Sequence, residues 1–137
     1  MPLKIYIASK FSSRYRMRPI KFRLKQLGFE VLSDWIDNNP LDETIGGDYD
    51  SIGNHPDASH DIAERDRQQV LECNIFIIDT QDVSETGGRE CELGMALMAS
   101  KPYIFRVGPI RNVFHAHKAV RVYKSWDALM PVLEALI

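Results

Sequence analysis

The sequence predicts an α/β protein whose core is a mostly parallel five-stranded sheet. Short apolar runs alternate along the chain with longer segments in which apolar residues recur every three or four positions. One run, residues 74–79, is almost wholly apolar, as in a parallel strand that is buried on both faces. It leads through a polar turn into paired glycines and a helix-forming segment. Strands that alternate with helices are connected by right-handed crossovers, so we expect them to lie parallel in one sheet.

The N-terminal part is expected to contain two strands with one helix between them. Residues 3–8 form the first predicted strand, and the polar turn 9–14 follows it. A helix is then indicated by apolar residues at spacings of three and four, and Gly28 is placed to end it. These apolar residues are Met17, Ile20, Leu24 and Leu27. Residues 29–35 form the second predicted strand.

Residues 37–57 interrupt this pattern. They are rich in Asn, Asp, Gly and Pro without a sustained period, so a long loop is expected there. Loops of that length are usually functional lids or disordered, and this one is a candidate cover for a pocket. The remaining predicted elements are a helix over 62–71, strands over 74–79, 101–107 and 121–123, a helix lined by Leu93, Ala96, Leu97 and Met98, and a last helix over 126–137 capped by Ser125.

The composition is that of one globular domain over residues 1–137. The chain is 45% hydrophobic and 26% charged, which is enough for a sizeable core. Its formal net charge of -2 argues against a protein that coats nucleic acid or membranes through bulk charge. Cys73 and Cys91 lack a CxxC spacing and indicate reduced thiols. No secretory or membrane-length apolar segment is apparent, so we expect a cytoplasmic enzyme or binding domain.

The segment around the paired glycines, residues 86–94, carries the strongest functional signal. Gly87 and Gly88 stand between a buried strand and a helix. Glycines let backbone N–H groups face outward, and the positive end of the helix dipole favours a bound anion or an ionised carboxylate. This turn is therefore expected to form a ligand site.

Two acids in this segment compete for that site. Glu90 and Glu92 are two positions apart, so on a helix they point about 200° apart and at most one of them faces a cleft. We expect Glu92 to be the functional acid and Glu90 to reach back and cap the first helical turn. From the residues alone, a structural role for Glu92 is an equal alternative.

Further candidate residues lie at the end of the first strand. Tyr6 is near the carboxyl edge at which open α/β sheets bind ligands, although a core aromatic residue is the plainer interpretation. The loop that follows is rich in hydroxyl groups and carries a cation, so it suits either a phosphate or the cap of a helix. Its residues are Ser9, Ser12, Ser13 and Arg14.

Two other patterns are expected to be structural. The helix is basic over residues 16–25, but a solvated helical face explains this better than nucleic-acid binding does in an acidic chain. His55 and His60 lie close in sequence to Asp57 and Asp61, without the spacing of a zinc or iron site. We therefore expect no metal site and no nucleic-acid partner.

Four fragments together resemble the nucleoside 2-deoxyribosyltransferase family, which includes deoxynucleoside 5′-monophosphate N-hydrolases. They are residues 4–9 (KIYIAS), the helix that contains Asp66, the strand that ends at Asp79, and residues 87–94 (GGRECELG). In this order they span nearly the whole chain. The resemblance implies a flavodoxin-like or Rossmann-like three-layer sandwich, a small nucleoside or nucleotide as substrate, and no cofactor.

The resemblance also implies roles for three residues. The family's nucleophilic glutamate matches Glu92, and its tyrosine at the end of the first strand matches Tyr6, which would orient that carboxylate. The aspartate proposed to protonate the base matches Asp66, eight residues before Asn74. Cleavage of an N-glycosidic bond would then pass through an oxocarbenium-like state and a covalent ester, with an acid assisting departure of the base.

The chain departs from the family pattern at two positions. Thr86 stands six residues before Glu92, where the transferases carry an aspartate for the sugar 5′-hydroxyl and the monophosphate hydrolases carry a hydroxyl residue for the phosphate. Thr86 therefore favours a 5′-phosphorylated substrate, bound together with Gly87 and Gly88, and the loop with Ser9, Ser12 and Arg14 agrees with it. Glu90 stands where some members have glycine, and it would oppose a phosphate if it faced inward.

The loop over residues 108–115 is the last informative segment. In the family, a residue from this region of a neighbouring subunit completes the pocket, which implies that Asn112, or less directly Arg111 or His115, crosses an interface in a homodimer or larger homo-oligomer. Without the resemblance, His115 and His117 belong to an ordinary turn.

Three classes of function are therefore compared below. The first is an enzyme that cleaves or transfers an N-glycosidic bond of a (deoxy)nucleoside or its 5′-monophosphate through Glu92. The second is a non-catalytic nucleotide-binding or sensing module in which Glu92 only orients the ribose. The third is a nucleic-acid-binding domain that uses the basic helix. The base, the sugar, and the choice between transfer and hydrolysis stay open at this stage.

Overall fold

The computed structural model describes residues 2–37, 39–46 and 49–137, and within them five strands form one parallel sheet. The strand order is β2-β1-β3-β4-β5, the order of a flavodoxin-like doubly wound sheet. The predicted α/β fold with a parallel five-stranded sheet is thus confirmed. The strands are β1 (Lys4–Ala8), β2 (Glu30–Val31), β3 (Ile75–Asp79), β4 (Tyr103–Val107) and β5 (Val120–Tyr123).

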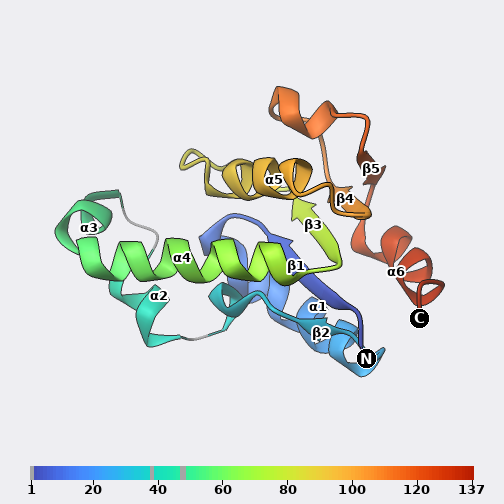
Figure 1. Cartoon of the computed structure of the whole chain (residues 1–137), viewed down its shortest axis with the longest axis horizontal. Helices are drawn as coiled ribbons and strands as arrows, with labels where there is room; N and C mark the ends of the chain where they lie inside the picture. The colour runs from blue at the N-terminus through green and yellow to red at the C-terminus, as the bar shows by residue number, and fades with distance from the viewer. Residues whose placement is uncertain (1, 38, 47–48) are drawn as a thin grey trace.

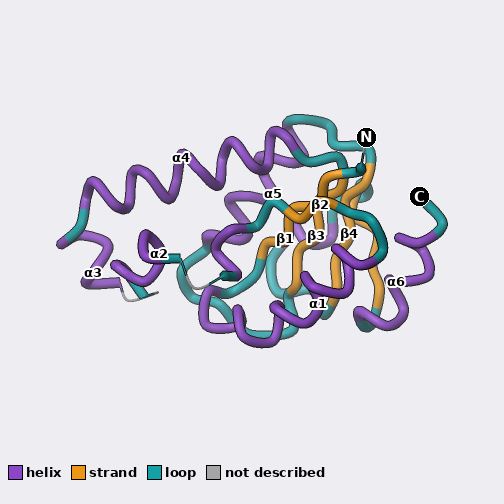
Figure 2. The backbone as a smooth tube through the Cα atoms, turned by 90° about the horizontal axis from the view of Figure 1, so that it is seen from below, coloured by secondary structure: helices purple, strands orange, loops and turns teal. Residues whose placement is uncertain are grey.

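Helices cover both faces of this sheet and give three layers. Figure 2 shows the sheet edge-on, with α1 and α6 on one side and α4 and α5 on the other. The helices are α1 (Arg14–Gln26), α2 (Pro40–Ile45), α3 (Tyr49–Asn54), α4 (Pro56–Glu72), α5 (Gly88–Met98) and α6 (Trp126–Glu134). Helices α2 and α3 lie beside the N-terminal half of α4, beyond the end of the sheet (Figure 1). No described helix is long and apolar enough to cross a membrane.

Strand β3 is the centre of the core. All five of its residues are buried, which fits the apolar run that predicted it. Its neighbours β1 and β4 pair with it in parallel register, with Tyr6 opposite Phe76 and Ile77 opposite Phe105. The rings of Tyr6 and Phe76 stack with centroids 6.0 Å apart. The site-bearing part of β1 is therefore held rigidly from both its face and its edge.

The second strand is shorter than predicted. It was expected over residues 29–35, but the ladder ends at Val31 and Asp34–Ile36 form a 3-10 turn, η2. Two side chains replace the lost ladder, because Ser33 Oγ accepts from Ile7 N–H at 2.6 Å and Trp35 Nε1–H donates to Ile7 C=O at 2.7 Å. Ser33 and Trp35 are both buried, so this segment stays against β1 although it does not continue the strand.

The prediction of a long loop over residues 37–57 was wrong for the described part of this segment, and residues 38, 47 and 48 lie outside the described residues. This part of the chain contains α2 and α3, and α4 begins earlier than predicted, at Pro56 instead of residue 62. Asn39 caps α2 by accepting from Leu41 N–H at 2.9 Å, and Gly46 ends it in the left-handed conformation. Both are standard helix boundary signals, but the helix between them has only six residues and no visible period.

Asp79 ties the end of β3 to both outer helices of one layer. Its fully buried carboxylate accepts from both guanidinium nitrogens of Arg16 on α1, at 3.0 and 3.1 Å, and from Trp126 Nε1–H on α6, at 2.8 Å. It also accepts from the backbone N–H of Gln81 at 3.0 Å. Because every contact to this carboxylate is internal, Asp79 has a structural role.

Candidate active site

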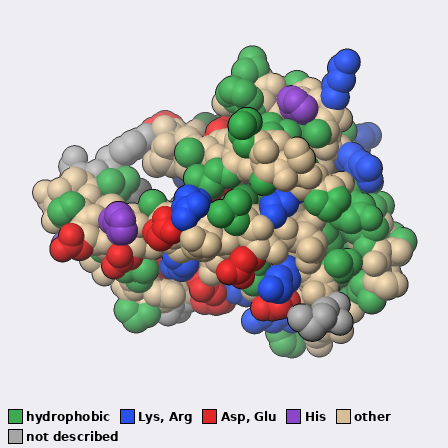
Figure 3. All heavy atoms as spheres, viewed as in Figure 1, with side chains coloured by type: hydrophobic (Ala, Val, Ile, Leu, Met, Phe, Trp, Pro, Cys, Tyr) green, Lys and Arg blue, Asp and Glu red, His purple; other side chains and the backbone are tan. Residues whose placement is uncertain are grey.

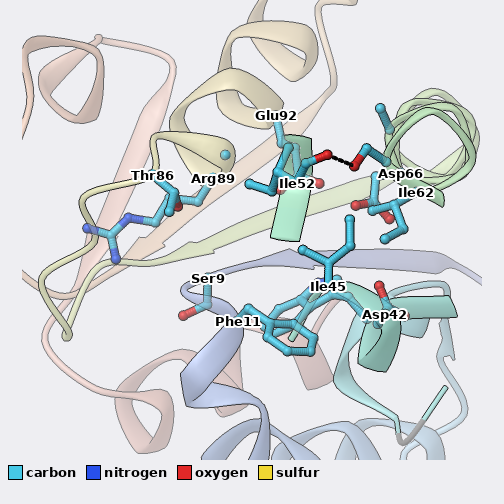
Figure 4. Close-up of a pocket in the computed structure, with 14 residues that line it drawn as sticks. Ser9, Phe11, Asp42, Ile45, Ile52, Ile62, Asp66, Thr86, Arg89 and Glu92 are labelled. Atoms are coloured by element: carbon cyan, nitrogen blue, oxygen red, sulfur yellow. Dashed lines mark hydrogen bonds between the residues drawn. The ribbon is translucent and has the colours of Figure 1, made fainter. Parts of the chain in front are cut away.

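A cavity of about 380 Å³ opens where the strand order reverses, between the ends of β1 and β3. Open α/β sheets bind their ligands at this position. Its walls come from the β1–α1 turn, η2, α2, α3, α4 and the start of α5 (Figure 4). The lining residues are Ser9, Phe11, Trp35, Asp42, Ile45, Ile52, Ser59, Ile62, Ala63, Asp66, Thr86, Gly88, Arg89 and Glu92.

A hydrogen bond joins Glu92, which lines this cavity, to Tyr6, which is not one of the lining residues. The hydroxyl of Tyr6, a fully buried residue of β1, donates to Oε2 of Glu92 on α5. Burial and the Glu92 carboxylate hold the pKa of Tyr6 well above its usual value, so the tyrosine stays a donor. The structure thus brings together two predicted site residues that come from β1 and α5.

Asp66 faces the same cavity from α4 and is held by its neighbour Arg65. Arg65 donates from Nε at 3.0 Å and from Nη2 at 2.8 Å, and both bonds end on Oδ1 of Asp66. The same guanidinium makes a two-pronged pair with the buried Asp42 of α2, at 2.7 and 2.8 Å. Sequence reasoning missed Arg65 and Asp42, because Asp42 lay in the segment read as loop.

Glu92 and Asp66, two of the acids that line the cavity, are both hard to ionise. Burial raises the pKa of Glu92 to about 8, and the Asp66 charge adds to this, while the Tyr6 hydrogen bond opposes it. Burial likewise raises the pKa of Asp66 to about 6, against the charge and hydrogen bonds of Arg65. Because they repel each other, these carboxyls titrate as a pair that holds about one proton near neutral pH.

The polar and apolar parts of the cavity are separated. In Figure 4, Ser9 and Thr86 lie to one side of Glu92, while Asp66 and Ile62 lie to the other. The Ser9 hydroxyl is buried and has no partner among the described residues. Apolar side chains form much of the lining, namely Phe11, Trp35, Ile45, Ile52, Ile62 and Ala63. The cavity therefore suits a molecule with a flat apolar end and a polar end.

The glycine turn opens α5 towards the polar end. Gly87 adopts a left-handed conformation, with φ of 76°, directly before the helix, and Gly88 is the first helical residue and lines the cavity. A residue with a Cβ would be strained at Gly87. The first N–H groups of a helix have no partner inside it, so this terminus can receive an anion or a polar group.

Four of the predicted binding residues lie outside this cavity. Ser12 lines a separate hollow beside Lys10 and Arg16, and Gly87 and Asn112 line another beside Glu90. Arg14 is not a lining residue either. Its guanidinium stacks 4.2 Å above the ring of Phe11, which does line the cavity, and its Nε is buried without a described partner.

Glu90 and His115 differ from what the sequence indicated. Glu90 does not reach back to cap α5, since its Oε1 accepts from Arg89 Nε at 2.8 Å and lies 3.2 Å from His115 Nε2. His115 is fully buried instead of belonging to an ordinary turn, and its Nδ1 accepts from the Arg111 N–H at 3.0 Å. As the spacing predicted, only one of the two acids of this turn, Glu92, lines the cavity.

Several basic side chains of α1 form ion pairs with acids of the same chain. Arg16 pairs with Asp79, Lys21 is buried against Asp37 at 2.8 Å, and Arg23 contacts Asp127 at 3.3 Å. On the face seen in Figure 3, acidic and basic side chains are interspersed over α4. Within the described residues, no group of three or more His, Cys, Asp or Glu side chains could hold a metal ion.

Two solved structures share this fold over most of their length. A 2-deoxyribosyltransferase from Bacillus psychrosaccharolyticus matches with a TM-score of 0.65 and 22% identity, over 90% of this chain and 88% of that chain. A CMP N-glycosidase from Clostridium botulinum matches with a TM-score of 0.58 and 16% identity, over 96% of this chain and 98% of that chain. At these identities the likeness establishes the fold.

The sequence comparisons add no closer relative. No protein-family model matches the chain. No curated protein matches it either. What this chain does must therefore be argued from its own cavity.

Because the pKa of Glu92 is raised in the folded protein, Glu92→Gln should gain stability relative to the unsubstituted chain as pH rises. The folded state holds the Glu92 proton more tightly than the unfolded state does. The free energy of unfolding of the parent therefore falls as the pH rises from 4.5, the ordinary pKa of the carboxyl, to about 8, its pKa in the folded protein. We expect the difference between variant and parent to shift by about 2 kcal/mol towards the variant from pH 5 to pH 9. Urea unfolding followed by circular dichroism measures it.

Glu64→Gln is the matched control for this measurement. Arg67 lowers the pKa of Glu64 to about 2, so this exposed carboxylate is ionised in both states at pH 5 and at pH 9. Its difference from the parent should therefore not change over that interval. A constant difference for Glu92→Gln as well would contradict a buried, hard-to-ionise Glu92.

Proposed function

We propose that this chain is a member of the nucleoside 2-deoxyribosyltransferase family and cleaves or transfers the N-glycosidic bond of a (deoxy)nucleoside or its 5′-monophosphate. The observation that supports this most is the hydrogen bond from Tyr6 to Glu92, in a cavity that Asp66 also lines. The fold shared with a deoxyribosyltransferase and a CMP N-glycosidase is consistent with it. The resemblance in sequence assigns the same three residues.

In this proposal Glu92 is the nucleophile. Cleavage of an N-glycosidic bond builds positive charge on the anomeric carbon, and a carboxylate beneath it stabilises that charge and then forms a glycosyl ester. Tyr6 holds one carboxylate oxygen, Oε2, which leaves Oε1 to attack. The hydroxyl also favours the ionised form of Glu92, against the burial that disfavours it. Water or a second base then takes the sugar from the ester.

Asp66 is the proposed acid for the departing base. It lines the cavity together with apolar side chains, against which a planar base would pack. Its pKa of about 6 lies close enough to neutral pH for a proton to be available. Glu92 and Asp66 would thus act on opposite ends of the same bond, one on the sugar carbon and the other on the leaving nitrogen base.

The polar end of the cavity favours a nucleoside 5′-monophosphate over the free nucleoside as the substrate. Thr86 and Gly88 lie at the start of α5, where the helix dipole attracts an anion, and the buried Ser9 hydroxyl lacks a partner. Glu90 is turned away from this end and paired with Arg89 and His115, so it does not oppose a phosphate there. Gly87 supports the turn without lining the cavity.

A non-catalytic nucleotide sensor is the second candidate. The specific observation in its favour is the pKa of Glu92, about 8, because a protonated carboxyl can bind a ribose hydroxyl without acting as a nucleophile. Such a module would show saturable nucleotide binding with no free base released from any substrate in a broad panel.

Glu92→Ala and Glu92→Gln should remain folded and lose release of free base by about 10³-fold or more, because the nucleophile is removed. Liquid chromatography of free bases, over a panel of nucleosides and 5′-monophosphates with and without an acceptor base, measures the loss. Glu72→Gln, an exposed acid at the end of α4, is the control and should keep the parent rate. Full activity of either Glu92 variant would exclude the mechanism.

The pH profile of kcat/KM should be bell-shaped, with its maximum between about 6 and 8. Activity requires the carboxyl pair to hold a single proton, which is lost above the pKa of about 8 and joined by a second proton below about 6. The reactive form is the one in which Glu92 is ionised and Asp66 carries the proton, and it is the less populated of the two singly protonated forms because the pKa of Glu92 lies above that of Asp66. Initial rates at substrate concentrations well below KM, measured across pH 4.5–9.5, check this. A value of kcat/KM that rises steadily to pH 9.5 would rule out Asp66 as the acid.

We also propose that the protein is a homo-oligomer assembled through the segment around Asn112. Ile110, Val113 and Phe114 flank this residue with large exposed apolar side chains. Exposed apolar side chains that gather in one place mark interaction surfaces. Asn112 itself lines a hollow with Gly87, close to the start of α5.

Val113→Asp should therefore shift the protein towards the monomer in size-exclusion chromatography with light scattering. Ile137→Asp, which adds the same charge to another exposed apolar residue at the last position of the chain, should not. A parent protein that is monomeric at 100-fold dilution and at its highest soluble concentration alike would overturn the assembly proposal.

A further inference from the structure

Arg65 lies between two carboxylates that belong to different parts of the molecule. On one side it makes the two-pronged pair with Asp42 of α2. On the other it donates two hydrogen bonds to Asp66, its neighbour on α4. The side chains of Arg65, Asp42 and Asp66 are 15%, 4% and 19% exposed, so this contact is largely sheltered from water.

The two hydrogen bonds to Asp66 end on the same oxygen. Both Nε and Nη2 of Arg65 donate to Oδ1, and no described residue donates to Oδ2. An oxygen that already accepts two charged N–H donors is a poor place for a proton, because the proton would point at the cation. A proton on this carboxyl must therefore sit on Oδ2.

We propose that Arg65 is a positioning residue, which fixes the proton of Asp66 on Oδ2 and so directs it into the cavity towards the departing base. This inference rests on the function proposed above and adds a residue to it. Asp42 completes the arrangement, because its pair with two nitrogens of Arg65 prevents the guanidinium from turning. The Arg65 side chain thereby links the position of α2 to the orientation of the Asp66 carboxyl.

The charges that face Asp66 come from four elements. Arg65 lowers the pKa of Asp66, while Asp42 on α2 and Asp34 on η2 raise it. Asp34 is held in place by Gln69 Nε2 at 2.9 Å. Glu92 on α5 interacts with the same carboxyl from the cavity side. Because Arg65 is the only cation in this set, removing it should raise the pKa of Asp66.

The direct test is a comparison of Arg65→Met with Arg67→Met. Arg67 lies two positions along α4 in an exposed pair with Glu64, so the matched change removes a cation of the same helix without touching Asp66. Carbon-13 NMR titration of the side-chain carboxyls, with Asp66→Asn to assign the signal, should show the pKa of Asp66 raised by about 1 or more in Arg65→Met alone. An Asp66 titration that is unchanged in Arg65→Met would overturn the inference.

The second readout uses the chemistry of the leaving group. A 7-methylpurine base is already cationic and departs without taking up a proton, whereas an unmodified base needs the acid. Arg65→Met should reduce kcat/KM for the unmodified substrate by about 10- to 100-fold and affect the 7-methylated one by less than about 3-fold. Equal losses on both substrates would mean that Arg65 only supports the fold of the cavity.

Arg65→Met leaves the buried Asp42 without its Arg65 partner and could destabilise the fold, so the test needs a control for loss of folding. Asp42→Asn combined with Arg65→Met removes that unpaired charge and should show the same dependence on the leaving group. The two proposals also fail separately. If the parent protein releases no base from any substrate, the proposed function is wrong, while the NMR titration still decides whether Arg65 controls the proton of Asp66.

Discussion

The site depends on one hydrogen bond, from the Tyr6 hydroxyl to the Glu92 carboxylate. It joins the central region of the sheet to the second turn of α5, two segments that lie 86 residues apart in the chain. Tyr6 is fully buried and stacked on Phe76 of the adjacent strand, so core packing holds its ring. The position of the carboxylate is therefore set by the core itself, and a loop movement would not displace it.

The sequence was a good guide to this part of the site and a poor guide to its surroundings. Tyr6, Asp66 and Glu92 stand on regular elements whose ends were visible as apolar runs, a helix and a glycine turn, so their convergence followed from topology. Arg65 and Asp42 did not, because a pair between α4 and a six-residue helix leaves no periodic signal in either segment. Tertiary contacts between short elements are the information that a single sequence lacks.

The same reason explains the errors around the sheet edge. Residues 33–35 were predicted to extend the second strand, but Ser33 and Trp35 instead use side-chain atoms to make the hydrogen bonds to β1 that a strand would make with its backbone. His115 was predicted to belong to an ordinary turn, since neither its neighbours nor its spacing in the sequence shows that its ring contacts Glu90. Local patterns report which residues are buried more faithfully than they report the partners that bury them.

The buried carboxylates of this protein differ mainly in how completely they are paired. Asp79 accepts from a guanidinium, an indole and a backbone N–H, which leaves no capacity for chemistry. Asp66 shares its cation with Asp42 and keeps one oxygen without a described donor. Among the described residues, the only donor to Glu92 is the neutral hydroxyl of Tyr6. An incompletely paired buried charge is costly for the fold, so the decreasing pairing from Asp79 to Glu92 lowers stability, and it agrees with the reactive role proposed for Glu92.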